Sequence, residues 1–163
     1  MAVLVTGGAG FIGSNFLHHL ITCTDEEIIC IDKLTYASDW NNIPDNVRFY
    51  TTDIADKHNC EFIYKKYKPT AVFHFAAESH VDRSIKDCSD FIHTNILGTV
   101  NLLNLSLKYE VKKFIHVSTD EVYGESMLNM DEQHKTENSV LCPSNPYAAT
   151  KAGAELIAKA YYH

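Results

Sequence analysis

The chain has 163 residues, enough for one domain with its own hydrophobic core, and its 45% apolar content excludes a disordered protein. The formal net charge is −7 and the lysines and arginines form no cluster, so we expect neither nucleic acid nor an anionic membrane as a partner. No apolar run approaches the roughly 20 residues that span a bilayer, and the N-terminus lacks the features of a signal peptide, so we expect a soluble, cytoplasmic protein.

The first half of the chain predicts short apolar strands that alternate with helices. Residues 2–6 and 27–31 are apolar runs typical of buried strands, and residues 11–23 between them show the apolar spacing of a helix. A third strand is expected at 47–50 and a second helix at 60–67.

The second half continues the alternation. Strands are expected at 71–75 and 113–117, with a long helix from about 89 to 109 between them. The chain from about residue 146 to its end predicts a last helix. Residues 125–144 are polar and predict a loop, at a position where such folds place lids over their sites.

The strands are apolar without alternation, which favours a parallel sheet covered by helices on both faces. Right-handed crossovers then give a doubly wound α/β architecture, the Rossmann fold. We find no sequence for the sixth strand that is usual in this fold, and the last helix shows no capping signal. We therefore interpret the chain as a fragment or a truncated product whose fifth strand lies at an exposed edge.

The cysteines and histidines of the sequence indicate neither disulfide bonds nor a metal site. The five cysteines form no CxxC pair, which suits reduced thiols in a cytosol-like compartment. The nine histidines are scattered without the spacing of zinc ligands, so we expect no metal.

A glycine-rich turn joins the first predicted strand to the first helix. Its glycines, Gly7, Gly10 and Gly13, have the spacing that permits a tight turn and a close approach of the backbone to a pyrophosphate. The N-terminus of the following helix supplies free N–H groups for the same anion. The alternative is a glycine-rich turn without a ligand.

An acidic residue, Asp32, ends the second predicted strand. A carboxylate there accepts hydrogen bonds from ribose hydroxyls and repels a 2′-phosphate, which favours NAD over NADP. Lys33 complicates this interpretation, because a cation could tolerate the phosphate.

Tyr147 and Lys151 are four residues apart on the last predicted helix and therefore share one face. A lysine cation beside the phenol is expected to lower its pKa toward neutrality and make it a usable acid or base. Such pairs are common by chance on helix surfaces. This pair gains significance from its position, one loop after the fifth strand.

Two adjacent carboxylates, Asp120 and Glu121, follow that strand, at the end where parallel sheets bind ligands. Burial of both would be costly, so they make sense as an acid and a base with separate roles. A solvated turn is the alternative.

Together these residues resemble the extended short-chain dehydrogenase/reductase family, and within it the nucleotide-sugar 4,6-dehydratases that act on dTDP-glucose or UDP-glucose. The resemblance covers the whole chain and is carried by residues Gly7–Gly13, Asp32–Ala37, Asp53–Ile54, Ala76–Asp82, Thr94–Asn95, Ser118–Gly124, Asn145–Tyr147 and Lys151.

The resemblance implies NAD as the cofactor and assigns residues to its parts. Those expected at the pyrophosphate are Gly7, Gly10, Phe11, Ile12 and Gly13. Those expected at the adenosine are Asp32, Lys33, Leu34, Thr35, Ala37, Asp53 and Ile54. Those expected along the rest of the cofactor are Phe75, Ala76, Ala77, Thr94, Tyr147 and Lys151.

The resemblance also implies the reaction and the residues that contact a nucleotide-diphosphate sugar, namely Ser79, Thr119, Asp120, Glu121 and Tyr147. Tyr147, assisted by Thr119, removes the proton of the sugar 4-hydroxyl while C4 gives hydride to NAD. Glu121 then takes the proton from C5, and Asp120 protonates the C6 hydroxyl, which leaves as water. Hydride returns to C6, and the product is a 4-keto-6-deoxy sugar nucleotide.

Members of this family are much longer than this chain, and their additional residues form most of a substrate-binding subdomain. The resemblance therefore implies that residues 1–163 are the NAD-binding Rossmann domain of such an enzyme, truncated before that subdomain. The helices at 89–109 and 146–163 resemble the pair that forms the family's dimer interface, so we expect a homodimer.

Two alternatives stay open. One is a nucleotide-sugar 4-epimerase, which would leave the paired acids without a role because the family's epimerases lack them. The other is a non-catalytic, truncated NAD-binding or dimerisation module.

Overall fold

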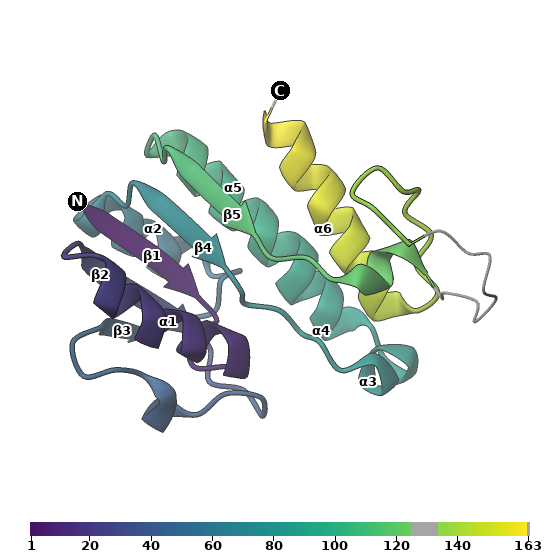
Figure 1. Ribbon diagram of the computed structural model, residues 1–163, viewed down its shortest axis with the longest axis horizontal. Coiled ribbons are helices and arrows are strands. Elements are labelled where there is room, and N and C mark those ends of the chain that lie inside the picture. The colour runs from purple at the N-terminus through teal and green to yellow at the C-terminus, as the bar shows by residue number, and fades with distance from the viewer. Residues whose placement is uncertain (125–133, 163) are drawn as a thin grey trace.

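The computed structural model describes residues 1–124 and 134–162. These ranges hold one parallel sheet in the strand order β3-β2-β1-β4-β5, with helices on both faces (Figure 1). The strands are β1 (Ala2–Thr6), β2 (Glu27–Asp32), β3 (Arg48–Thr51), β4 (Ala71–His74) and β5 (Lys113–His116). This order confirms the predicted doubly wound α/β fold.

The register brings the carboxyl ends of the strands to one edge of the sheet. Thr6 at the end of β1 pairs with Ile31 of β2 on one side and with His74 of β4 on the other. His74 in turn pairs with His116 of β5. The loops that follow β1, β2, β4 and β5 therefore leave the sheet as neighbours.

The helical segments surround this sheet. They are α1 (Phe11–Cys23), α2 (Lys57–Tyr67), α3 (Val81–Lys86), α4 (Ser89–Phe91), the π-helix η2 (Ile92–Gly98), α5 (Thr99–Lys108) and α6 (Pro146–Tyr162). Two short 3₁₀ turns, η1 (Trp40–Asn42) and η3 (Asp120–Tyr123), complete the described elements.

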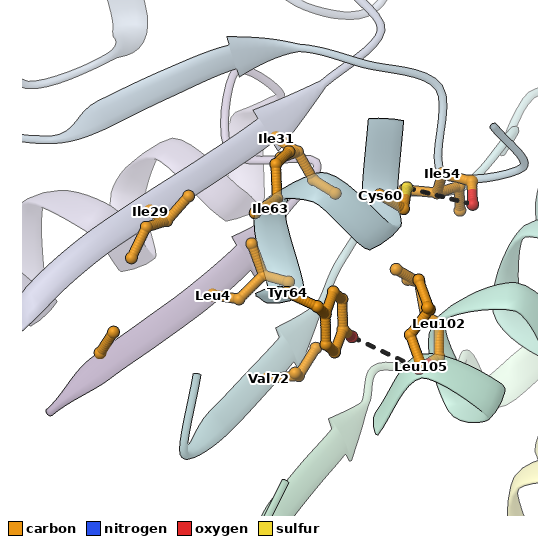
Figure 2. Close-up of a cluster of buried hydrophobic side chains, with 11 residues drawn as sticks. Leu4, Ile29, Ile31, Ile54, Cys60, Ile63, Tyr64, Val72, Leu102 and Leu105 are labelled. Atoms are coloured by element: carbon orange, nitrogen blue, oxygen red, sulfur yellow. Dashed lines mark hydrogen bonds between the residues drawn. The ribbon is translucent and has the colours of Figure 1, made fainter. Parts of the chain in front are cut away.

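One face of the sheet is covered by α2 and α5. Side chains of the three central strands, such as Leu4 and Val72, meet Tyr64 of α2 and Leu102 of α5 (Figure 2). All four are fully buried. The Tyr64 hydroxyl donates a hydrogen bond to the Leu102 carbonyl oxygen at 3.3 Å, so the one polar atom of this side chain is satisfied inside the core.

The opposite face is covered by α1. Leu17 of this helix is fully buried against Val5 and Cys30 of the sheet. The Phe16 ring lies 4.6 Å from the ring of Phe73 on β4, measured between centroids. Because both faces are covered, successive strand residues are buried in turn, which explains why the strands lack the alternating pattern of a half-exposed sheet.

The segment expected as one helix at 89–109 is helical but not uniformly α-helical, because residues Ile92–Gly98 form a π-helix between α4 and α5. Helix α3 was not predicted from the sequence, and α2 begins before the expected residue 60. Asp56 begins α2 by accepting hydrogen bonds from the backbone N–H groups of His58 and Asn59, so Lys57 is its first residue.

The polar segment expected to be a loop at 125–144 is described from residue 134, and residues 134–144 contain no helix or strand. Residues 125–133 lie outside the described ranges. Among the described strands, β5 pairs only with β4 and lies at one edge of the sheet. No helix in residues 1–124 and 134–162 has the length and apolar character needed to cross a membrane.

Candidate active site

A cavity of about 340 Å³ lies at the carboxyl edge of the sheet. It brings together most of the predicted site residues: Gly7, Gly10, Phe11, Ile12, Gly13, Asp32, Lys33, Thr35, Ala37, Asp53, Ile54, Phe75, Ala76, Ala77, Ser79, Thr94, Tyr147 and Lys151. Its lining also includes residues that were not predicted, namely Ser38, Thr52, Glu78, Val117 and Ser118. Leu34, Thr119, Asp120 and Glu121 are not part of the lining.

The glycine-rich turn forms one end of this cavity. Gly7 has a φ of 72°, and a Cβ there would lie 2.5 Å from the Ala76 backbone nitrogen. A Cβ on Gly13 would lie 2.2 Å from the Gly7 carbonyl oxygen, so packing within the protein requires both glycines. Gly10 differs, because a Cβ there would meet no protein atom closer than 3.4 Å. Its lack of a side chain instead keeps the cavity open at the N-terminus of α1, which has no side-chain cap. This arrangement fits a pyrophosphate.

The carboxylate of Asp32 is buried and held in place by the backbone. Its Oδ2 accepts a hydrogen bond from the Ala9 N–H at 3.0 Å, and its Oδ1 accepts one from the Leu34 N–H at 2.8 Å. Each oxygen keeps a further lone pair for a ribose hydroxyl. Leu34, which was expected at the adenosine, serves here by fixing Asp32 through its own backbone.

Lys33 does not point freely into the cavity. Its Nζ lies 2.8 Å from Oδ2 of Asp53, in the loop that follows β3. His93 of the π-helix approaches the same carboxylate oxygen, with Nε2 at 3.2 Å.

A buried chain of hydrogen bonds runs from the sheet to the helices behind the cavity. Thr6 Oγ1 lies 2.7 Å from Nδ1 of His74, whose Nε2 lies 2.9 Å from Oγ1 of Thr99. The Thr99 hydroxyl donates its proton to the Asn95 carbonyl oxygen at 2.7 Å, so it accepts from Nε2–H of His74. Burial holds the pKa of His74 well below its usual value, so the ring is neutral with its proton on Nε2.

Asn95 extends this chain to the cavity wall and to α6. Its side chain makes two hydrogen bonds with the backbone of Glu78, at 2.9 and 3.0 Å, and donates a third to Oγ1 of Thr150 at 2.9 Å. Asn95 is 2% exposed, and its role was not predicted from the sequence. No signal in the sequence singles out Asn95, because the same helical segment also contains other polar residues such as Asn101 and Ser106.

Tyr147 and Lys151 of α6 both face the cavity. The prediction that Lys151 lowers the pKa of the Tyr147 phenol is wrong. Burial raises the pKa of Tyr147; the Thr119 hydroxyl opposes this rise, and the charges of Glu121 and Asp120 add to it. The Lys151 ammonium donates its hydrogen bond to the Val117 carbonyl oxygen at 2.6 Å. In this structure the cation is therefore engaged by the backbone at the end of β5.

The surroundings of Lys151 are poor in negative charge. Burial lowers the pKa of Lys151 to about 8, and Glu155 one turn later opposes that shift. His116 lies nearby with both ring nitrogens buried and without a hydrogen-bond partner in the described part of the chain. Burial and then the charge of Lys151 lower the pKa of His116 to about 4, which keeps its ring neutral.

The paired acids lie in η3, which follows β5 after the short connection of residues 117–119. Thr119 caps this turn by accepting a hydrogen bond from the Glu121 N–H at 3.3 Å. Oε2 of Glu121 accepts a hydrogen bond from Nδ2 of Asn145 at 2.8 Å, and Oδ1 of Asn145 accepts one from the Ala148 N–H at the start of α6. Asn145 therefore joins Glu121 to the helix that carries Tyr147. The structure thus places the acids beside this helix but outside the cavity lining.

The sheet order, the glycine-rich turn and the acid at the end of β2 define a dinucleotide-binding domain of the Rossmann class. The sequence profile of the GDP-mannose 4,6 dehydratase family matches residues 4–163. The chain belongs to this family.

Relatives and solved structures agree with this assignment. The chain is 46% identical over 176 residues to the dTDP-glucose 4,6-dehydratase of Haemophilus influenzae, covering 99% of this chain and 52% of that protein. It is 44% identical over 170 residues to the dTDP-glucose 4,6-dehydratase of Streptomyces antibioticus, covering 99% of this chain and 49% of that protein. The chain thus spans about half the length of these curated relatives.

Two solved structures illustrate the similarity of fold. The dTDP-glucose 4,6-dehydratase DesIV of Streptomyces venezuelae, crystallised with NAD, has a TM-score of 0.90 and 44% identity, covering 99% of this chain and 52% of that one. The UDP-glucose 4-epimerase of Thermus thermophilus, also in complex with NAD, has a TM-score of 0.91 and 36% identity, covering 99% of this chain and 50% of that one.

The lowered pKa of Lys151 predicts a pH-dependent stability. Between about 8 and the ordinary value of 10.5, the unfolded chain binds more protons at this residue than the folded chain, so the free energy of unfolding rises with pH. From neutral pH to above pH 10, we expect the wild type to gain about 3 kcal/mol relative to Lys151→Met. Urea denaturation at a series of pH values measures this difference.

The control for this measurement is Lys159→Met on the same helix, because the ammonium of Lys159 is largely exposed. The difference between wild type and this variant should show no comparable rise. An equal pH dependence of both variants would contradict the burial of a charged Lys151.

Proposed function

We propose that the chain is the NAD-binding, catalytic portion of a nucleotide-sugar 4,6-dehydratase. The observation that carries the proposal is the cavity. It is lined by the glycine-rich turn that fits a pyrophosphate, by the acid Asp32 at the expected ribose, and by the Tyr147–Lys151 pair. When bound, NAD supplies the acceptor and donor for the hydride. Support comes from two relatives named dTDP-glucose 4,6-dehydratase at 44% and 46% identity, and from NAD in the related crystal structures.

The protein's own contribution is positioning and proton transfer. Tyr147 removes the proton of the sugar 4-hydroxyl, with Thr119 beside it. Burial raises the pKa of this phenol and so opposes the loss of its proton, whereas the hydrogen bond with Thr119 lowers the pKa and assists that loss. Glu121 takes the C5 proton, and its carboxylate is oriented for this by Asn145. Asp120 protonates the departing C6 hydroxyl, and Ser79 contacts the sugar.

The proposal extends to partners and location. We infer that residues 1–163 form the NAD-binding domain and that dTDP-glucose, with UDP-glucose as the alternative, is the nucleotide-diphosphate sugar. We also infer a cytoplasmic homodimer formed through α5 and α6. Exposed apolar side chains on these helices and on the π-helix support the dimer: Leu97, Leu107 and Leu156.

The test of the reaction is incubation of the chain with NAD and either dTDP-glucose or UDP-glucose, followed by mass spectrometry. A 4-keto-6-deoxy product, lighter than the substrate by one water, supports the dehydratase. An epimerised sugar of unchanged mass would instead support the 4-epimerase, which the similarity to the Thermus thermophilus enzyme keeps as a second candidate. A folded, NAD-binding chain without any product would support a non-catalytic module.

Glu121→Gln is expected to lower the rate of water loss by at least about 100-fold, because a neutral amide cannot take the C5 proton. NAD affinity should be retained, since Glu121 does not line the cavity. Product formation and NAD binding by calorimetry check the two parts. The control is Glu137→Gln, an exposed glutamate in the segment before α6, which should behave as wild type. Full dehydration activity in Glu121→Gln would remove the role assigned to this residue.

Gly10→Ala is expected to fold with wild-type stability and to lose about tenfold or more in NAD affinity. The new methyl group has room within the protein, with its nearest atom at 3.4 Å, but intrudes on the cavity where the pyrophosphate would lie. Gly13→Ala is the matched comparison, because its methyl group would clash with Gly7 and should lower the stability as well. Calorimetric titration with NAD and urea denaturation separate the two effects. Undiminished NAD binding by Gly10→Ala would contradict the assignment of this turn.

A further inference from the structure

The cation next to the predicted ribose site is held by a carboxylate from a different strand. Lys33 follows Asp32 at the end of β2, and its Nζ lies 2.8 Å from Oδ2 of Asp53 after β3. All three residues line the same cavity. The Lys33 side chain is 50% exposed and that of Asp53 is 22% exposed, so the pair lies at the rim, where a bound nucleotide would shield it from water.

Asp53 is fixed independently of the lysine. Its Oδ1 accepts a hydrogen bond from the Ala55 N–H at 2.9 Å, within the turn that leads into α2. Its Oδ2 also lies 3.2 Å from Nε2 of His93. Burial alone would raise the pKa of Asp53, but the hydrogen bonds from Lys33 and Ala55 lower it further than burial raises it, so the carboxylate stays ionised. The Asp53 carboxylate is therefore held by contacts of its own, and the longer side chain of Lys33 extends to reach it.

Domains of this class distinguish NADP from NAD by what surrounds the 2′ position of the adenosine ribose. An acid at the end of the second strand repels a 2′-phosphate, whereas a free cation nearby accommodates it. In this chain Lys33, which follows Asp32 in the sequence, could supply such a cation. Its charge is instead neutralised by the Asp53 carboxylate. A 2′-phosphate would thus meet two carboxylates and one lysine that is already paired.

We infer that Asp53 is a specificity-determining residue for the dinucleotide, which excludes NADP by holding the Lys33 ammonium away from the 2′ position. The inference rests on the proposed NAD binding and deepens it, because it gives Lys33 and Asp53 a joint role in choosing between two cofactors.

The test is calorimetric titration of the chain with NAD and with NADP at one fixed, low ionic strength. The variants are Asp53→Asn, Lys33→Ala and the double variant. Asp53→Asn keeps an oxygen that can accept from the Ala55 N–H while losing the charge that holds Lys33. We expect the ratio of the NADP to the NAD dissociation constant to fall about tenfold in Asp53→Asn. This fall should disappear in the double variant, because the released cation is then missing.

Lys33→Ala alone should not lower that ratio, because it removes no negative charge and leaves the Asp53 carboxylate without its counter-ion. The control for the change in net charge is Asp25→Asn, an exposed aspartate that precedes β2 at the opposite edge of the sheet, and its ratio should be unchanged.

Three results would overturn the inference. The ratio could stay at its wild-type value in Asp53→Asn. It could fall equally with and without Lys33, which would mean that only repulsion by Asp53 acts. Lys33→Ala alone, a variant that leaves the hydrogen bond between Asp53 and the Ala55 N–H intact, could lower the ratio about tenfold, which would mean that the lysine itself, and not its pairing with Asp53, excludes NADP. A folded wild type that binds neither nucleotide is a different result, because it removes the proposed function and the inference with it.

Discussion

The neutral, fully buried imidazole of His74 holds the centre of this domain together. It receives a hydrogen bond from Thr6 at the end of β1 and donates one to Thr99 on α5, so a single ring connects the sheet to the helical layer. Through Thr99 the connection continues to Asn95, and from there to Glu78 in the cavity wall and Thr150 on α6. Every link is buried, where an unmatched partner would be costly, so the helix that carries Tyr147 has one defined position relative to the strand ends.

The electrostatics of the site depend on which groups remain neutral. Lys151 is buried beside His116, and a second positive charge there would oppose the lysine directly. The pKa of His116, lowered to about 4, removes that charge at neutral pH. At the other end of the cavity the balance is reversed, because Asp32 and Asp53 outnumber the single lysine between them. The cavity thus has the Lys151 cation at the end near Tyr147, and two carboxylates beside one lysine at the end near Asp32.

The sequence was sufficient for the strands, most helices and the glycine-rich turn, because apolar runs and glycine spacing are local signals. Most of the remaining cavity lining followed only from the resemblance to a known family. The sequence was insufficient where contacts between residues far apart in the chain determine which partner a side chain binds. The spacing of Tyr147 and Lys151 showed that they share a face but not that the Val117 carbonyl would take the ammonium. The π-helix has no simple sequence signature, and the pairing of Lys33 with Asp53 joins residues from two strands. Asp120 and Glu121 follow the expected strand, but they belong to a 3₁₀ turn and do not line the cavity.

The π-helix at Ile92–Gly98 gives this segment an unusual tolerance of a change in length. A π-helical turn holds about one residue more than an α-helical turn, so it resembles a one-residue insertion that the surrounding packing has absorbed. Removal of one residue would let the segment relax into a regular α-helix while its two flanks keep their relative orientation. In a regular α-helix such as α5, the same deletion would rotate one flank by about 100° relative to the other. A single codon deletion that spares Asn95 should therefore be tolerated better within the π-helix than within α5.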